Sequence, residues 1–177
     1  MYAVAYCPVS CADRLDGFGF ADSKQLSEKQ RDELLVTINN NSSWLKYKTR
    51  SLTSKYLSNS MLRRQPVSLN TISYDTAIQL IQALIDDHVD IRELYIDTVG
   101  DAVRYKQRLH ELFPQIDRII VESKADSTYK IVSAASIVAK TTRDHSILNY
   151  NYIEQYDNIH TFKPSNQYGS GYVHCVC

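Results

Sequence analysis

The chain has 177 residues, with 20 Lys and Arg, 20 Asp and Glu, and a formal net charge of zero. Its hydrophobic content of 44% and charged content of 23% are typical of a soluble globular domain, and the length suits one domain with a substantial core. No run approaches the roughly 18 apolar residues that a membrane span needs. The balanced charge excludes nucleic-acid binding through bulk charge alone, so any such contact requires a local arrangement of basic residues.

The first third of the chain predicts a strand, a helix and a second strand. Tyr2–Cys7 reads as a strand. Ser27 and Gln30 have the spacing of a capping box, which predicts a helix through about Ile38. Lys and Arg alternate with other residues from Trp44 to Leu52, which predicts a strand with one basic face. An edge strand protected by lysines explains that face, and contact with nucleic acid is the alternative.

A β-α-β-α pattern follows. An apolar helical stripe begins near Ser73, and Leu94–Asp97 reads as a short buried strand. A helix from Asp101 stops before Pro114, Ile119–Val121 forms the next strand, and a last helix runs from about Ser127 to Leu148. Strands joined by such a helix are normally parallel, so both end at the edge of the sheet where ligands bind in open α/β folds.

Two carboxylates are expected at that edge. Asp97 closes the first of the two strands, and Asp126 follows the second by five residues. Paired carboxylates suit a hard cation such as Mg²⁺, and two such ions promote phosphodiester cleavage. In the alternative interpretation, Asp126 caps a helix and Asp97 starts a turn before Gly100. The small residues of the following helix fit either close packing or the close approach of a phosphate.

Four motifs make the pattern specific. "ADSKQLSEKQRDEL", "YIDTVGD", "SKADSTYKIVSAASIVAKTTRDH" and "YGSGY" occur in this order, and "SMLRRQPVSLNTISYDTA" adds to them. Together they resemble the catalytic large subunits of the ribonuclease H type 2 family, most of all the eukaryotic branch. The similarity extends from Tyr2 to Tyr172. It implies an α/β fold, a ribonuclease H-like mixed sheet flanked by helices.

The resemblance also implies an activity and its residues. Members hydrolyse the RNA strand of RNA–DNA hybrids and nick duplex DNA at single ribonucleotides, with two Mg²⁺ or Mn²⁺ ions and four carboxylates. Asp97 matches the third carboxylate and Asp126 the fourth. The residues that match substrate contacts in the family are Lys24, Ser133, Ser136, Lys140 and Tyr172, and Tyr172 matches the tyrosine that packs on the sugar at the RNA–DNA junction.

Partners and location follow from the same resemblance. The expected partners are RNA–DNA hybrids, ribonucleotide-containing DNA and the two non-catalytic subunits of the eukaryotic complex, with no membrane. The expected location is the nucleus, with roles in DNA replication and ribonucleotide excision repair. A non-catalytic relative that binds hybrids or subunits is the alternative function.

The chain departs from the family at both ends. The family's first strand carries Asp-Glu-Ala-Gly-Arg-Gly, whereas this chain starts at the second strand, and residues 173–177 resemble an unrelated tail after a partial ribonuclease H-like domain at 1–172. The C-terminal helices of the family are also expected to be missing. Loss of the central strand predicts unpaired backbone on Tyr2–Cys7 and Leu94–Asp97, poor folding alone and weak or absent cleavage.

Overall fold

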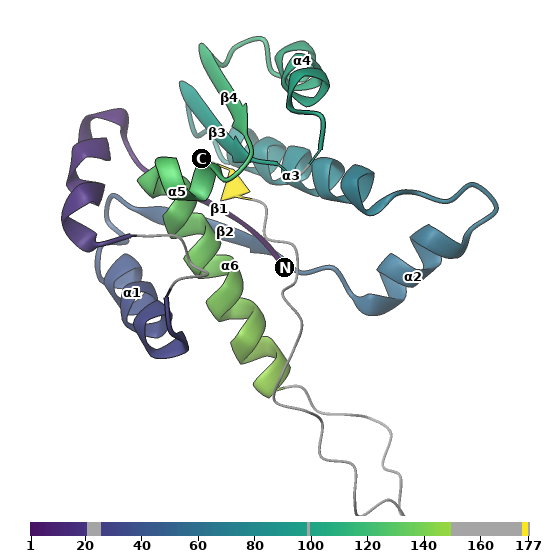
Figure 1. Cartoon of the computed structure of the whole chain (residues 1–177). Helices are drawn as coiled ribbons and strands as arrows, with labels where there is room; N and C mark the ends of the chain where they lie inside the picture. The colour runs from purple at the N-terminus through teal and green to yellow at the C-terminus, as the bar shows by residue number, and fades with distance from the viewer. Residues whose placement is uncertain (21–25, 99, 150–174, 177) are drawn as a thin grey trace, which may run out of the picture.

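A five-stranded mixed sheet forms the centre of the molecule (Figure 1). The structure is a computed structural model that describes residues 1–20, 26–98, 100–149 and 175–176. The strand order is β2-β1-β5-β3-β4, with β1 antiparallel to β2 and β3 parallel to β4. The strands are β1 (Tyr2–Tyr6), β2 (Lys46–Arg50), β3 (Glu93–Asp97), β4 (Arg118–Glu122) and β5 (Cys175–Val176).

Helices cover both faces of the sheet. Successive side chains of β1 point to opposite faces of the sheet. Tyr2 and Val4 pack in one core with α3 and α4, and Ala3 and Ala5 pack in a second core with α6 and α1. Within the described residues, none of these helices has the length and hydropathy of a membrane span. The helices are η1 (Val9–Phe18, a 3₁₀ helix), α1 (Glu28–Asn40), α2 (Ser54–Leu62), α3 (Leu69–Asp86), α4 (Ala102–Leu112), α5 (Ala125–Thr128) and α6 (Lys130–Leu148).

Local signals explain where the helices begin. The capping box predicted for α1 is confirmed, because Ser27 Oγ accepts from Gln30 N at 3.3 Å and Gln30 Oε1 accepts from Ser27 N at 2.9 Å. The helix expected from Ser73 begins earlier, at Leu69. Ser68 caps it by accepting from Thr71 N at 3.1 Å, a signal that lies before the apolar stripe.

The last predicted helix is divided into two. Tyr129 has an extended backbone, with φ −107° and ψ 118°, and separates the one-turn α5 from α6. Asp126 therefore lies inside α5, whereas the prediction placed it just before a single long helix. The helices η1 and α2 were not predicted, because each buries a single residue and so carries no apolar stripe.

The sequence predicted that β1 and β3 would lack a strand between them, but β5 pairs with both. Val176 of β5 pairs with Val4 of β1 and with Ile96 of β3, and β5 is parallel to the first and antiparallel to the second. The two residues of β5 therefore join the two halves of the sheet, although β1 and β3 are each five residues long. The division at residues 172 and 173 stays a prediction, but Cys175 and Val176 are part of this sheet.

Val176→Pro tests the contribution of β5. Val176 is paired on both sides, and proline removes its backbone N–H from this position, so we expect the free energy of unfolding to fall by about 1–3 kcal/mol. Val176→Thr keeps the N–H and the β-branched shape and serves as the control. Thermal unfolding monitored by circular dichroism measures both, and equal midpoints for the two variants would show that β5 contributes nothing.

Candidate metal centre

The carboxyl ends of β3 and β4 meet at one edge of the sheet. The two strands are parallel in register, so Asp97 is opposite Glu122, and Thr98 N continues the ladder by donating to Glu122 O at 3.0 Å. This arrangement confirms the parallel pairing predicted from the β-α-β pattern. The chain leaving β4 therefore begins its turn beside the end of β3.

That turn brings the second carboxylate to the first. Lys124 adopts a left-handed backbone with φ 60°, which reverses the chain and starts α5. The first amide of the helix, Ala125 N, donates to Asp97 Oδ1 at 3.2 Å. Asp126 is the residue after Ala125, so this hydrogen bond brings Asp97 and Asp126 to the same edge of the sheet.

The environment of Asp126 suits a cation ligand. Its side chain is only 5% exposed, and no described residue donates a hydrogen bond to its carboxylate. A buried carboxylate is costly without a positive partner, and a divalent ion supplies one. Mg²⁺ is commonly held by one or two carboxylates together with water and phosphate oxygens. Asp97 and Asp126 fit one such hydrated ion.

A second ion has fewer ligands. Within the described part of the chain, no group of three or more His, Cys, Asp or Glu side chains is arranged to hold a metal. Glu122 shares the edge with Asp97, but its carboxylate accepts a 3.4 Å hydrogen bond from Tyr129 Oη. Among the described residues, this edge therefore offers carboxylates for at most one ion.

The predicted residues of α6 lie on one buried face of that helix. Ser133, Ser136 and Lys140 are spaced by three and four residues, and they are 1%, 3% and 7% exposed. Lys140 is therefore not the solvated lysine that the sequence allowed as an alternative. The role of these three residues as substrate contacts stays a prediction. Lys24 and Tyr172 lie outside the described residues.

An aromatic pair that was not predicted supports the loop after Asp97. Tyr74 of α3 stacks on Tyr105 of α4 with ring centroids 4.0 Å apart. Gly100 lies against this pair so closely that an added Cβ would be 1.8 Å from Tyr74 Oη. Glycine at this position therefore lets the loop that follows Asp97 pack on α3.

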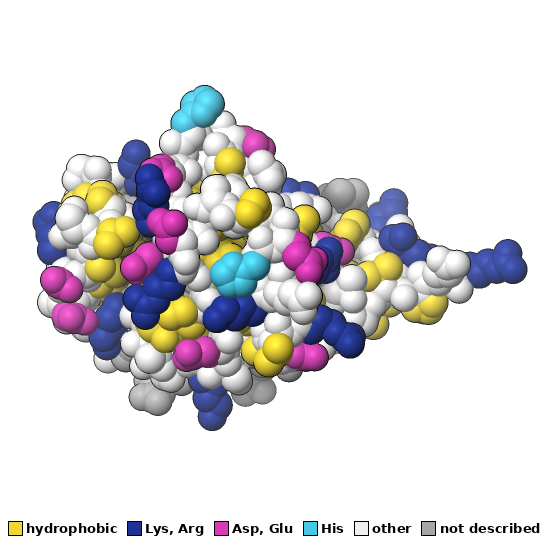
Figure 2. All heavy atoms as spheres, turned by 90° about the horizontal axis from the view of Figure 1, so that it is seen from above, with side chains coloured by type: hydrophobic (Ala, Val, Ile, Leu, Met, Phe, Trp, Pro, Cys, Tyr) yellow, Lys and Arg dark blue, Asp and Glu magenta, His cyan; other side chains and the backbone are white. Residues whose placement is uncertain are grey.

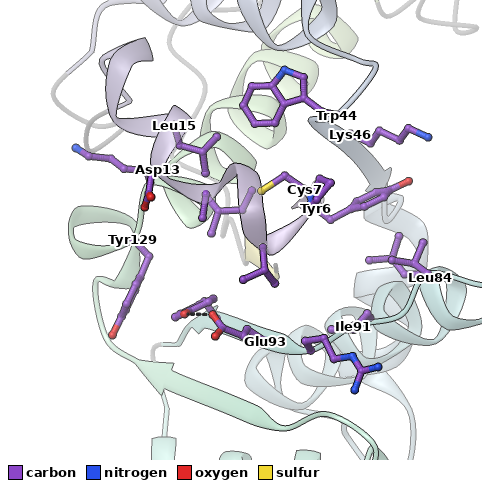
Figure 3. A pocket seen from close by; sticks show the side chains of 18 of the residues that line it. Tyr6, Cys7, Asp13, Leu15, Trp44, Lys46, Leu84, Ile91, Glu93 and Tyr129 are labelled. Carbon is purple, nitrogen blue, oxygen red and sulfur yellow. Dashed lines mark hydrogen bonds between the residues drawn. The ribbon is translucent and has the colours of Figure 1, made fainter.

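A cavity of about 530 Å³ opens at the other end of the strands (Figure 3). Tyr6 and Cys7 at the end of β1 lie across it from Glu93 at the start of β3, and Tyr95 also lines it. Tyr95 Oη donates to Glu93 at 2.5 Å, and burial, followed by this hydrogen bond, raises the pKa of Tyr95 to about 12. Thr128 and Tyr129 also line the cavity, so it extends to the end of the short helix that carries Asp126.

A family comparison identifies the relatives of this arrangement. The family model described as ribonuclease HII matches residues 1–171. The chain belongs to the ribonuclease HII family. It is similar to the A subunit of ribonuclease H2 from Dictyostelium discoideum, with 44% identity over 174 residues that cover 97% of this chain and 60% of the relative. The A subunit of human ribonuclease H2 is 37% identical over 172 residues, 97% of this chain and 55% of the relative.

Solved structures of the ribonuclease HII family share the fold. The complex of PCNA and RNase HII from Archaeoglobus fulgidus matches with a TM-score of 0.67 and 25% identity, covering 84% of this chain and 74% of the other. Ribonuclease H2 from Pyrococcus horikoshii matches with a TM-score of 0.63 and 28% identity, covering 83% and 74%. The predicted ribonuclease H-like fold is confirmed, as is the eukaryotic type of catalytic subunit, and the chain spans about three fifths of its curated relatives.

Gly100→Ala tests the support of the Asp97 loop. The added methyl group meets Tyr74 Oη, so we expect the variant to lose about 1–3 kcal/mol of unfolding free energy. Adding Tyr74→Phe removes the clashing oxygen and restores part of the loss, which a double-mutant cycle by urea denaturation measures. A neutral Gly100→Ala variant would show that this contact does not constrain the loop.

The cavity predicts a weakly reactive Cys7. Burial, with a smaller contribution from nearby Cys11, raises the pKa of Cys7 to about 11. Since the thiolate is the nucleophile, about one molecule in a thousand is reactive at pH 8. We expect iodoacetamide to alkylate Cys7 slowly at pH 8, with a rate that rises until about pH 11. Peptide mass mapping against time measures this rate, and a plateau reached below pH 9 would contradict the burial of the thiol.

Proposed function

We propose that this chain carries the Asp97–Asp126 half of the metal centre of a hybrid-specific endonuclease. The observation that supports this most strongly is the hydrogen bond from Ala125 N to Asp97 Oδ1, which holds one carboxylate beside the helix that carries the other. The family membership supports the substrate class, an RNA–DNA hybrid or a ribonucleotide in duplex DNA. The proposed reaction is hydrolysis of the phosphodiester bond on the RNA strand.

The proposed roles of the residues follow from their placement. Asp97 and Asp126 would hold Mg²⁺ or Mn²⁺, and in the two-ion mechanism of the family the bound metal would supply activation of water and stabilisation of the leaving oxygen. The turn at Lys124 orients Asp126, and the Ala125 amide fixes the rotamer of Asp97. Lys24, Ser133, Ser136, Lys140 and Tyr172 are proposed to contact substrate.

The assembly and location belong to the same proposal. The relatives are named as one lettered subunit of ribonuclease H2, which implies a complex of several subunits. We propose that this chain works with two non-catalytic subunits in the nucleus, in replication and ribonucleotide repair.

A second candidate is a relative that binds hybrids without cutting them. It is favoured by the ligand count, because the described residues offer no group of three metal-binding side chains. The two candidates differ in what a divalent ion does to substrate binding. Mg²⁺ joins carboxylates to phosphate oxygens in the first and has no site in the second.

Metal-dependent binding separates the candidates. We expect Mg²⁺ to tighten binding of a fluorescent RNA–DNA hybrid by about tenfold in the wild-type chain, and to have no effect in Asp97→Asn or Asp126→Asn. Asp117→Asn, the same change at an exposed residue at the opposite end of β4, is the control. Fluorescence anisotropy measures the affinities, and an equal Mg²⁺ effect in all four proteins would overturn the assignment.

Cleavage by the 177-residue chain is expected to be slow, because the described edge provides ligands for one ion. Gel analysis of a hybrid incubated with Mn²⁺ measures it. Fast cleavage that persists in Asp97→Asn would exclude this edge as the catalytic site, and hybrid binding that does not change with Mg²⁺ would favour the non-cutting relative.

A further inference from the structure

Charge is distributed unevenly along a chain whose net charge is zero. From Leu34 to Tyr74 there are six Lys and Arg residues and no Asp or Glu. These 41 consecutive residues include β2 and α2 and are all described by the structure. The basic residues are Lys46, Lys48, Arg50, Lys55, Arg63 and Arg64.

Helix α2 forms a projecting arm. Figure 1 shows it extending away from the sheet, and Figure 2 shows a projection whose tip carries Lys and Arg side chains. We use the term basic arm for residues 51–68, which comprise α2 and its two connections. Lys55, Arg63 and Arg64 of the basic arm are exposed.

The cations of the arm have no carboxylate partners within the described residues. Arg63 makes a 3.4 Å hydrogen bond to the hydroxyl of Ser60, and no ion pair involves Lys55, Arg63 or Arg64. Lys48, by contrast, is paired with Asp87. Three charges of one sign that are held apart from any acid produce a local positive field, which attracts a polyanion.

The register of the sheet places the arm on the carboxylate side of the molecule. Arg50 pairs with Tyr2 at the start of β1, and Asp97 ends β3. Because β1 and β3 run in opposite directions on either side of β5, Arg50 and Asp97 lie at the same edge of the sheet. The arm leaves the sheet from this edge, since α2 begins four residues after Arg50.

Simple dimensions give the reach of this surface. Three strand spacings of about 4.8 Å separate β2 from β3, which is about 14 Å. The three residues between β2 and α2 add at most about 11 Å, and the nine residues of α2 add at most about 14 Å along its axis. A duplex has one phosphate per strand about every 3.4 Å, so the arm and Asp97 together span at most about twelve base pairs.

We propose that the basic arm binds the phosphodiester backbone of a nucleic-acid duplex, within about twelve base pairs of the Asp97–Asp126 edge. This proposal rests on the proposed function for the substrate class and adds a contact surface to it. The cations position the duplex without reading its sequence, which is the usual role of Lys and Arg contacts to phosphate.

A protein partner fits the arm less well. Met61 and Leu62 are 43% and 84% exposed, which is compatible with a protein interface. Protein interfaces are enriched in Met and Arg and depleted in Lys, so the feature that favours a polyanion is the unbalanced positive charge of the arm and not its residue types. Three unpaired cations on a short helix and its end favour a polyanion, and the apolar side chains are compatible with contact to sugars or a groove.

The test is the salt dependence of duplex binding by the full chain. In EDTA, which prevents cleavage, anisotropy measures the affinity for a hybrid of about 20 base pairs between about 50 and 200 mM KCl. We expect the triple variant Lys55→Gln, Arg63→Gln and Arg64→Gln to bind about tenfold more weakly at about 100 mM salt and to reduce the slope of log K against log salt by about 2–3.

Two triple variants serve as controls. Lys46→Gln, Arg92→Gln and Arg118→Gln remove three exposed cations at the opposite edge of the sheet, and we expect the wild-type slope. Lys55→Arg, Arg63→Lys and Arg64→Lys keep the charges, and we expect wild-type binding. Circular dichroism confirms that each variant is folded, and loss of binding in the charge-preserving variant would attribute the effect to folding and overturn the proposal.

The outcomes also separate this proposal from the proposed function. An unchanged salt slope in the arm variant would overturn the arm contact even if Mg²⁺ still tightened hybrid binding through Asp97 and Asp126. The reverse result, a reduced slope without any Mg²⁺ effect, would support the arm while rejecting the metal centre. Loss of binding to phosphatidylserine vesicles with an unchanged duplex slope would assign the arm to a membrane and contradict the proposal.

Discussion

The hydrogen bond between Ala125 N and Asp97 Oδ1 constrains the arrangement on which the proposed site depends. It requires β3 and β4 to be parallel and in register, because only then does the chain after β4 turn beside the end of β3. It also requires the left-handed turn at Lys124, which directs the first amide of α5 towards the carboxylate. One backbone donor thus joins two strands, a turn and a helix at the position of both acidic residues.

The sequence predicted the elements that have strong local signals. The capping box of Ser27 and Gln30 determined α1, and the apolar strands on either side of α4 determined the parallel pair. It did not predict α2, because the helix buries little apolar surface and its cap at Thr53 has no acidic or amide partner three residues later. The break at Tyr129 and the contact of Gly100 with Tyr74 depend on packing between distant segments, which one sequence does not display.

The candidate site was predictable to a different degree from the fold. Asp97 and Asp126 were located because parallel strands must end together, and the structure brings them to one edge. The burial of Lys140 was not predictable, because a lysine in a helix of small residues is usually solvated. The pairing of β5 between β1 and β3 was also missed, because two residues give no periodic signal.

Basic and acidic residues are separated along the chain, although the net charge is zero. The acidic residues Asp97 and Asp126 lie at the end of β3 and in α5, whereas all charged residues from Leu34 to Tyr74 are Lys or Arg. A metal centre of negative side chains repels a phosphodiester unless cations compensate for it. The separation of the two signs over one edge of the sheet is therefore consistent with a single extended polyanion that contacts both.

The position of a bound paramagnetic ion tests the central claim most directly. In ¹H–¹⁵N spectra of the chain with substoichiometric Mn²⁺, the account predicts selective broadening of the amide signals of Thr98, Gly100, Ala125 and Asp126, and no such broadening after Asp97→Asn. Broadening centred on another acidic segment, such as the turn from Asp86 to Asp90, would contradict a metal centre at the ends of β3 and β4.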